Sequence, residues 1–305
     1  MKQPSMQLKR LGVSAASALA LTLASGFAQA GPVTTWDFST DSTFTASTFG
    51  AGTGTTTATD YELSWGAASG DFESPGAFPN FNRSALTIGT VFGSRTGGGP
   101  ATGSVDTIIG AGPPLPANIG FGTSFTHWNN IISANFATLV SGTVTDTLTL
   151  TPTAPAAYLP AASVDAPTLE FVFQFRETPN LGTGGVCADG NPPPDAGCPD
   201  LFGFTISGLN NAFTYFDPVD NINRTYLASV LVLNADLTDA FPIQQLTAGE
   251  CAALGLASGC FGFRTAEEAA TTANFAFSVR TPEPGTLALL GLALALLGFS
   301  RRKKA

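Results

Sequence analysis

The chain has 305 residues, of which 44% are hydrophobic and only 11% charged, and 22 acidic against 13 basic residues give a net charge of −9. Seven of the basic residues lie among the first ten or the last five positions, so residues 31–281 hold six basic and 21 acidic residues, a net charge of −15. A surface of this sign repels phosphate backbones, and we therefore expect no nucleic acid partner.

The N-terminus has the three parts of a secretory signal peptide. Basic residues open the chain, an apolar stretch runs from Leu11 to Phe27, and Ala28-Gln29-Ala30 has the small-x-small form of a cleavage site. The alternative is a membrane anchor, but the apolar stretch is short and interrupted by serine and threonine. We predict that residues 1–30 engage the general secretion machinery and are removed.

The region between residues 31 and 281 is rich in Thr, Ser, Gly and Asn, which favours strands joined by tight turns over a helical core. Apolar alternation recurs in five runs, Thr143–Leu150, Leu169–Phe175, Leu201–Ser207, Tyr226–Leu233 and Asn274–Val279. These runs predict one all-β ectodomain over residues 31–281, an antiparallel β-sandwich of jelly-roll-like form.

Few segments of this region have a helical pattern. The range Thr247 to Leu256 is one candidate, because Thr247 can cap it and Glu250 completes a capping box. Residues 265–271 indicate another short turn. The glycine- and proline-rich ranges Gly93–Pro116 and Gly182–Pro199 are predicted to be long surface loops.

Four cysteines fall into two close pairs, Cys187 with Cys198 and Cys251 with Cys260. An exported chain meets an oxidising compartment, so two disulfides are expected; of the three possible connectivities, the neighbouring pairs are the easiest to close. A metal site is the alternative, but the tight CxxC spacing and a nearby histidine are both missing.

The string Thr126-His127-Trp128-Asn129 contains the chain's single histidine. One histidine gives neither a zinc triad nor a Ser-His-Asp set without distant partners. A structural role is therefore favoured, in which Thr126 and Asn129 satisfy a turn or sheet edge while Trp128 packs. The alternative is a binding segment in which an exposed Trp128 stacks on a sugar ring; exposure of the indole separates the two.

Two acidic loops, residues 217–221 and 189–195, contain the oxygen ligands that calcium prefers, but neither has EF-hand spacing and turn chemistry explains both. We predict no metal and no cofactor, with calcium as the alternative. A glycosidase needs two carboxylates facing a cleft. The sequence does not bring Glu170, Glu177 or Asp220 together in that way, so we predict no catalytic residues and no enzyme.

The C-terminal segment, residues 282–305, combines a helix breaker, an apolar run and a basic stop. Pro282-Glu283-Pro284 favours an extended backbone, and the apolar run Thr286–Phe299 is shorter than the roughly 20 residues of a durable span. The basic residues that follow should stay cytoplasmic; they are Arg301, Arg302, Lys303 and Lys304. We predict a short transmembrane sorting helix that anchors the chain transiently in the inner membrane, with a plain anchor as the alternative.

This tail resembles the PEP-CTERM sorting signal of Gram-negative bacteria that make extracellular polysaccharide, and residues 126–129 resemble the signature of its THxN subfamily. The resemblance implies that the chain is a substrate of exosortase, a membrane transpeptidase-like enzyme that processes the tail near Pro282-Glu283-Pro284. We then expect a surface or matrix protein associated with exopolysaccharide or biofilm. The alternatives are a carbohydrate-binding module with a sugar site near Trp128 and a secreted hydrolase.

Overall fold

The structure is a computed structural model that describes residues 31–73, 82–110, 112–156, 162–195, 197–205, 210–233 and 243–282. The predicted signal peptide, residues 1–30, lies outside the described residues. The same holds for most of the predicted sorting residues, namely Glu283, Pro284, Arg301, Arg302, Lys303 and Lys304.

The described residues form fifteen strands in two sheets. The strands of the first sheet are β1 (Thr35–Phe49), β5 (Ala101–Asp106), β7 (Leu139–Ala154), β8 (Val164–Asp165), β9 (Leu169–Arg176), β10 (Asp200–Phe204), β13 (Gln244–Gln245) and β14 (Phe261–Thr265). They pair in the order β13-β14-β10-β9-β7-β1-β5, with β8 also paired to β7. This sheet therefore takes strands from both halves of the chain.

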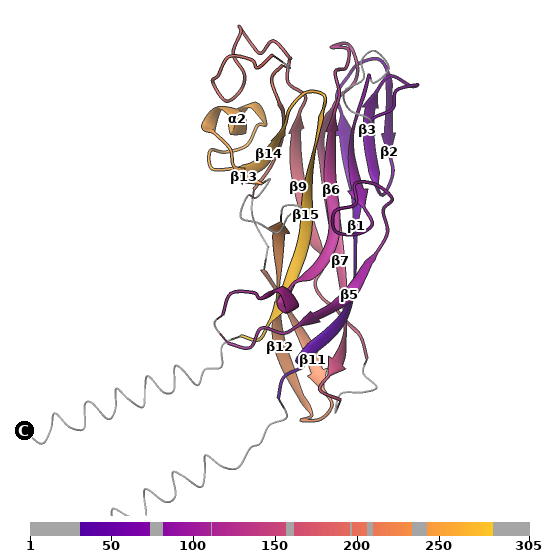
Figure 1. Cartoon of the computed structure of the whole chain (residues 1–305), viewed down its shortest axis with the longest axis vertical. Helices are drawn as coiled ribbons and strands as arrows, with labels where there is room; N and C mark the ends of the chain where they lie inside the picture. Colours follow the sequence, from indigo (N-terminus) through magenta and orange to yellow (C-terminus); the bar gives the residue numbers. More distant parts are fainter. Residues whose placement is uncertain are drawn as a thin grey trace, which may run out of the picture.

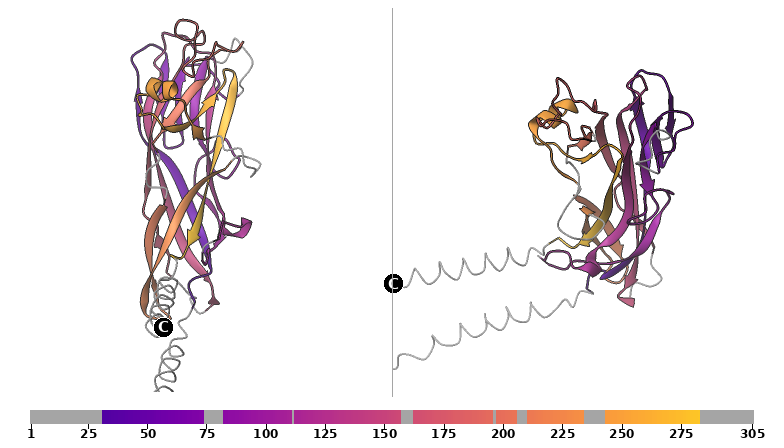
Figure 2. Two further views of the ribbon diagram at one scale, coloured as in Figure 1. Left: turned by 90° about the vertical axis from the view of Figure 1, so that its left-hand side faces the viewer. Right: turned by 45° about the horizontal axis from the view of Figure 1, so that its top comes forward.

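The second sheet takes its strands from the same two halves. They are β2 (Thr55–Ala58), β3 (Glu62–Gly66), β4 (Arg83–Gly89), β6 (Gly120–Asn129), β11 (Asn210–Asp217), β12 (Ile222–Leu233) and β15 (Ala269–Arg280). Their order is β11-β12-β15-β6-β4-β3-β2, and neighbouring strands are antiparallel. The two curled sheets form a long β-sandwich (Figures 1 and 2), which confirms the all-β prediction. The jelly-roll-like order stays a prediction.

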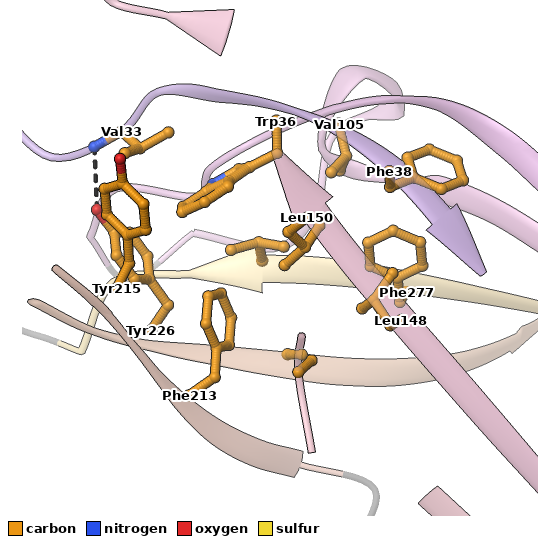
Figure 3. Close-up of a cluster of buried hydrophobic side chains, with 13 residues drawn as sticks. Val33, Trp36, Phe38, Val105, Leu148, Leu150, Phe213, Tyr215, Tyr226 and Phe277 are labelled. Carbon is orange, nitrogen blue, oxygen red and sulfur yellow. Dashed lines mark hydrogen bonds between the residues drawn. The ribbon is translucent and has the colours of Figure 1, made fainter. Parts of the chain in front are cut away.

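Aromatic side chains fill the space between the sheets, because alternate residues of each strand point inward. At one end Trp36 of β1 contacts Phe213, Tyr215 and Tyr226 with ring centroids 5.1–5.8 Å apart (Figure 3). The Tyr226 hydroxyl also accepts a hydrogen bond from the Val33 amide at 3.0 Å. A second cluster further along the sandwich is built mainly from phenylalanines, namely Phe44, Phe125, Phe173, Phe175, Phe202 and Phe263.

One loop prediction is wrong. The range Gly93–Pro116 contains the edge strand β5, which pairs with β1 from Thr40↔Ala101 to Thr35↔Asp106. Ala101 and Val105 of this strand are buried. The small residues between them hide the alternation, and the exposed backbone edge of the long strand β1 supplies the hydrogen-bond partners that make this segment a strand.

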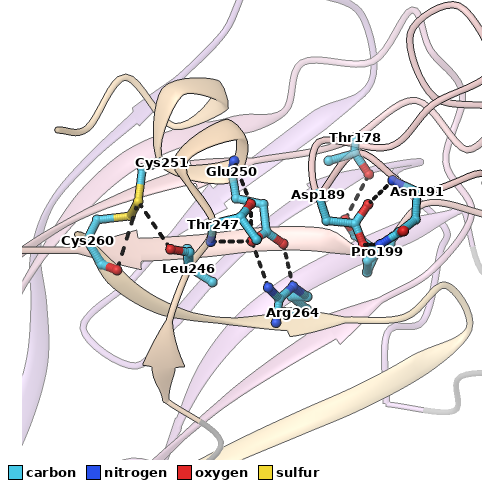
Figure 4. Close-up of polar contacts among 10 residues, drawn as sticks. All are labelled: Thr178, Asp189, Asn191, Pro199, Leu246, Thr247, Glu250, Cys251, Cys260 and Arg264. Carbon is cyan, nitrogen blue, oxygen red and sulfur yellow. Dashed lines mark hydrogen bonds and ion pairs between the residues drawn. A yellow bond between two sulfur atoms is a disulfide. The ribbon is translucent and has the colours of Figure 1, made fainter. Parts of the chain in front are cut away.

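The helix and disulfide predictions are confirmed at one end of the sandwich. Helix α2 (Ala248–Ala253) is capped by Thr247, whose hydroxyl and amide both interact with Glu250, and Glu250 also pairs with Arg264 (Figure 4). Two disulfides join the neighbouring cysteines, Cys187–Cys198 and Cys251–Cys260. The loop that the first disulfide closes has no strand or helix in its described residues.

The two ends of the described chain meet at the opposite end of the sandwich. Thr107 donates its amide to Thr34 O at 2.8 Å, and Thr281 donates to Ile108 O at 3.1 Å. Helix α2 and the loop of the first disulfide lie at the other end of the sandwich, at the top of Figure 1. The segment that leads into the sorting tail therefore leaves the sandwich beside its N-terminus.

Candidate functional site

The Thr-His-Trp-Asn string forms the end of β6, between β4 and β15 in the middle of the second sheet. All four side chains are buried. His127 lies inside the sandwich, where its ring stacks on Trp65 at 6.2 Å and contacts Phe175 of the other sheet at 4.9 Å. Because side chains alternate along a strand, Asn129 shares the inner face with His127.

Trp128 lies on the outer face of β6 but is covered. Only 4% of the residue is exposed, and its indole donates a hydrogen bond to Thr87 at 2.8 Å. Phe72 packs on the ring, and the Arg95 guanidinium lies 5.5 Å from its centroid. The exposed indole that the sugar-stacking hypothesis requires is therefore not present at this position.

Three carboxylates gather beside His127, and the sequence did not predict this cluster. Glu177 directly follows β9, Asp200 opens β10, and Glu267 lies in the short turn that crosses from β14 to β15. One oxygen of each lies within 4.8 Å of the others. The His127 Nε2 atom is 3.8 Å from Asp200 Oδ2. We call Glu177, Asp200 and Glu267 the carboxylate cluster.

Many polar atoms of this region have no hydrogen-bond partner among the described residues. They are both ring nitrogens of His127, Oδ2 of Asp200, both carboxylate oxygens of Glu267, Oδ1 of Asn129 and the hydroxyl of Thr265. Since a buried polar atom without a partner costs about 1–3 kcal/mol, this concentration marks the region around His127 as the candidate site.

Local contacts hold the cluster in place. Thr178 donates its amide to Asp200 Oδ1 at 2.8 Å and its hydroxyl to the Cys198 carbonyl at 3.0 Å. The Trp65 indole donates to Glu177 Oε2 at 2.9 Å. The first disulfide therefore constrains the loop that begins at Glu177 and ends at Asp200.

Burial shifts the pKa of every titratable group here. It raises the pKa of Glu177 to about 7 and that of Glu267 to about 8, to which the charge of Glu177 adds. Burial, together with the charges of Glu177 and Glu267, raises the pKa of Asp200 well above its ordinary value. The imidazole of His127 is neutral, because burial lowers its pKa to about 3. The cluster can bind a cation or share protons, but it is too enclosed for a sugar.

The other carboxylates singled out in the sequence lie elsewhere. Glu170 is exposed on β9, and Asp220 lies in the β11–β12 turn, at the end of the sandwich that is remote from Glu177. In that turn Asp217 accepts two backbone amides and pairs with Arg224. In the other acidic loop Asp189 accepts hydrogen bonds from Asn191. Both acidic loops therefore use their carboxylates for turn structure.

The comparisons bear on the tail of the chain. Residues 280–304 match the PEP-CTERM protein-sorting motif. The sorting motif implies an exported protein that exosortase recognises and that is anchored at the membrane by its C-terminus during sorting. No curated protein matches the chain. Within the described residues, no helix has the length and apolar character needed to cross a membrane.

Proposed function

We propose that this protein is a structural or interaction component of the extracellular matrix, retained at the cell surface or among exopolysaccharide after exosortase has processed its tail. The observation that carries this proposal is the sorting motif at residues 280–304. Two disulfides, and a sandwich in which the first and last described residues of the chain lie together, are compatible with a domain displayed outside the cell. The proposal includes a cleaved signal peptide and membership of the THxN subfamily.

The test is the distribution of the protein in the native host, with and without exopolysaccharide synthesis. We expect the processed protein in the matrix fraction of polysaccharide-producing cells and in the medium of cells that make none. An equal distribution in the two strains would rule out retention by polysaccharide and leave a surface protein whose partner is another protein.

A carbohydrate-binding module remains the first alternative, but its sugar site would have to lie away from Trp128. Among the described residues, Phe216 of β11 is an aromatic side chain with an exposed fraction of 53%. Saturable binding of exopolysaccharide that Phe216→Ala removes would favour the module. The hydrolase alternative requires turnover of the polysaccharide, and the carboxylate cluster does not offer the open pair of carboxylates that a glycosidase uses.

A further inference from the structure

We propose that the carboxylate cluster binds a divalent cation and that its oxygen ligands select calcium. Oxygen atoms of Glu177, Asp200 and Glu267 lie within 4.8 Å of one another. Calcium binds oxygen ligands at about 2.3–2.6 Å, so two ligands on opposite sides of one ion are about 4.6–5.2 Å apart. The spacing of the three carboxylates therefore fits a single shared ion.

The unpartnered atoms around the cluster give a second, independent reason. Asp200 is fully buried and Glu267 is 4% exposed, yet Oδ2 of Asp200 and both oxygens of Glu267 lack a hydrogen bond within the described part of the chain. Asn129, also fully buried, has a free Oδ1. A cation with six to eight oxygen ligands would satisfy these atoms together.

Two other buried carboxylates of the molecule have an arginine partner, whereas the carboxylates of the cluster have none among the described residues. The buried carboxylates of Asp217 and Glu250 each pair with an arginine, Arg224 and Arg264 respectively. In the described residues, no arginine or lysine forms an ion pair with a carboxylate of the cluster, which has only the imidazole of His127 beside it. Buried carboxyl groups without a cationic partner must keep their protons or bind a cation, and a divalent ion can supply the positive charge that no arginine or lysine provides here.

The ligand types favour calcium over zinc. The three groups that share the spacing are carboxylates, whereas zinc sites in proteins rely on Cys and His. His127 is not part of the set with the shared spacing, and its Nε2 lies beside Asp200. An ion could reach the cluster through Glu177, which is partly exposed and lines a surface hollow with Phe175 and Leu254. This site is independent of the proposed matrix role.

The test is calorimetric titration of the exported protein, expressed from the full chain and stripped with chelator, with calcium, manganese and zinc chlorides separately. We expect one calcium ion per chain, and an affinity that Asp200→Asn or Glu267→Gln lowers about tenfold or more. The matched control is Glu268→Gln, since Glu268 is the exposed neighbour of Glu267; it should change the affinity less than about twofold.

Three results would overturn the proposal. Wild-type protein that binds no divalent cation would indicate a cluster that shares protons instead. Equal loss of affinity in the Glu268 control and in the cluster variants would place the ion elsewhere. Preference for zinc at the same residues would overturn the selection of calcium and leave a site in which His127 is a ligand.

A second measurement uses only wild-type protein, in case the variants fold poorly. The Trp65 indole donates to Glu177 at 2.9 Å, so terbium, a luminescent substitute for calcium, would bind next to this ring and emit when tryptophan is excited. We expect sensitised emission that calcium abolishes, and a rise in Tm of about 5–10 °C at calcium about a hundred times Kd. Absence of both at saturating ion would overturn the proposal.

Discussion

Trp128 supplies a large apolar surface on the outer face of the second sheet, closed by Phe72 and Arg95 and fixed by the hydrogen bond to Thr87. Trp128→Ala would leave a cavity and remove the hydrogen bond to Thr87, so we expect it to lower the free energy of unfolding by about 3–5 kcal/mol. Denaturant unfolding measures this loss. Phe216→Ala is the control, because an exposed side chain should change stability by less than about 0.5 kcal/mol. Unchanged stability with lost polysaccharide binding would reinstate a sugar site at Trp128.

Asp146 of β7 faces the space between the sheets, where Thr40 and Ser42 donate hydroxyl hydrogen bonds at 3.0 and 3.1 Å. Burial raises the pKa of Asp146 to about 6, to which the neighbouring charge of Asp41 adds. The ordinary value is about 4, so between these values the folded state holds the proton more tightly than the unfolded chain. The stability that this group contributes therefore falls as pH rises from about 4 to 6.

Asp146→Asn tests this pH dependence, because an amide keeps the shape and still accepts from the two hydroxyls but cannot ionise. We expect the free energy of unfolding of the variant, relative to wild type, to increase across this range by at most about 3 kcal/mol. Thermal and urea unfolding of both proteins from pH 4 to 7.5 measures the difference. Parallel profiles for the two proteins would mean that Asp146 titrates normally.

At the scale of elements, the roles of the two disulfides can be compared by removing each one in turn. They are similar in size, with sequence separations of 11 and 9 residues, so each crosslink should contribute about 3 kcal/mol through loop entropy. Only the first one is tied to the carboxylate cluster, through the hydrogen bonds of Thr178 to Cys198 and Asp200. Replacing Cys187 and Cys198 by serine should therefore weaken calcium binding about tenfold.

The control replaces Cys251 and Cys260 by serine. We expect a comparable fall in Tm but a calcium affinity within about twofold of wild type, measured by the same titration. A similar loss of affinity in both double variants would show that the loops act through overall stability and not through the placement of Glu177 and Asp200.

Helix α2 packs closely on the loop of the first disulfide. A Cβ added at Gly249 would lie 2.4 Å from the carbonyl oxygen of Ala188. Gly→Ala in a helix normally stabilises by up to about 1 kcal/mol; here the clash should reverse the sign and cost about 1–3 kcal/mol. Gly112→Ala, which meets nothing within 4 Å, is the control in denaturant unfolding. A stabilised Gly249→Ala protein would show that the loop moves away without cost.

The sequence predicted those elements whose pattern is local. The alternation of Leu169–Phe175 and the capping pair of Thr247 and Glu250 depend on neighbours in the chain, and both elements form as predicted. The range Gly93–Pro116 was mistaken for a loop because β5 gains its hydrogen bonds from β1, more than fifty residues away. Strand formation by small polar residues depends on such distant partners.

The same limit explains why the carboxylate cluster was missed. The sequence singled out His127 and Asn129 through their motif, and Glu177 only as a possible catalytic acid. Asp200 and Glu267 carry no motif, and they approach His127 only because β10 pairs with β9 while the chain crosses to the other sheet between β14 and β15. An acidic residue at the start or just beyond the end of an apolar strand is a weak signal, since turn chemistry explains it equally well.

For the molecule as a whole, the cluster and the described residues that lead into the tail lie at opposite ends of the sandwich. Asn129 pairs with Ala269 at the start of β15, whereas Arg280 at its other end leads into the tail. Twelve strand residues span about 35 Å. The calcium site should therefore face away from the membrane while the tail is anchored, and it should be insensitive to processing of the tail.

Glu283→Ala tests this separation of sorting from folding. Because the carboxylate lies within the Pro-Glu-Pro triplet of the motif at residues 280–304, we expect the variant to remain uncut in the membrane fraction of the native host, while wild-type protein is trimmed near Pro284. Mass spectrometry of the C-terminus measures the cut. The uncut variant should keep the wild-type Tm and calcium affinity in detergent, since the carboxylate cluster lies at the end of β15 opposite to Arg280. An intact tail on the wild-type surface form would contradict the sorting step, and a changed calcium affinity in the variant would contradict the separation.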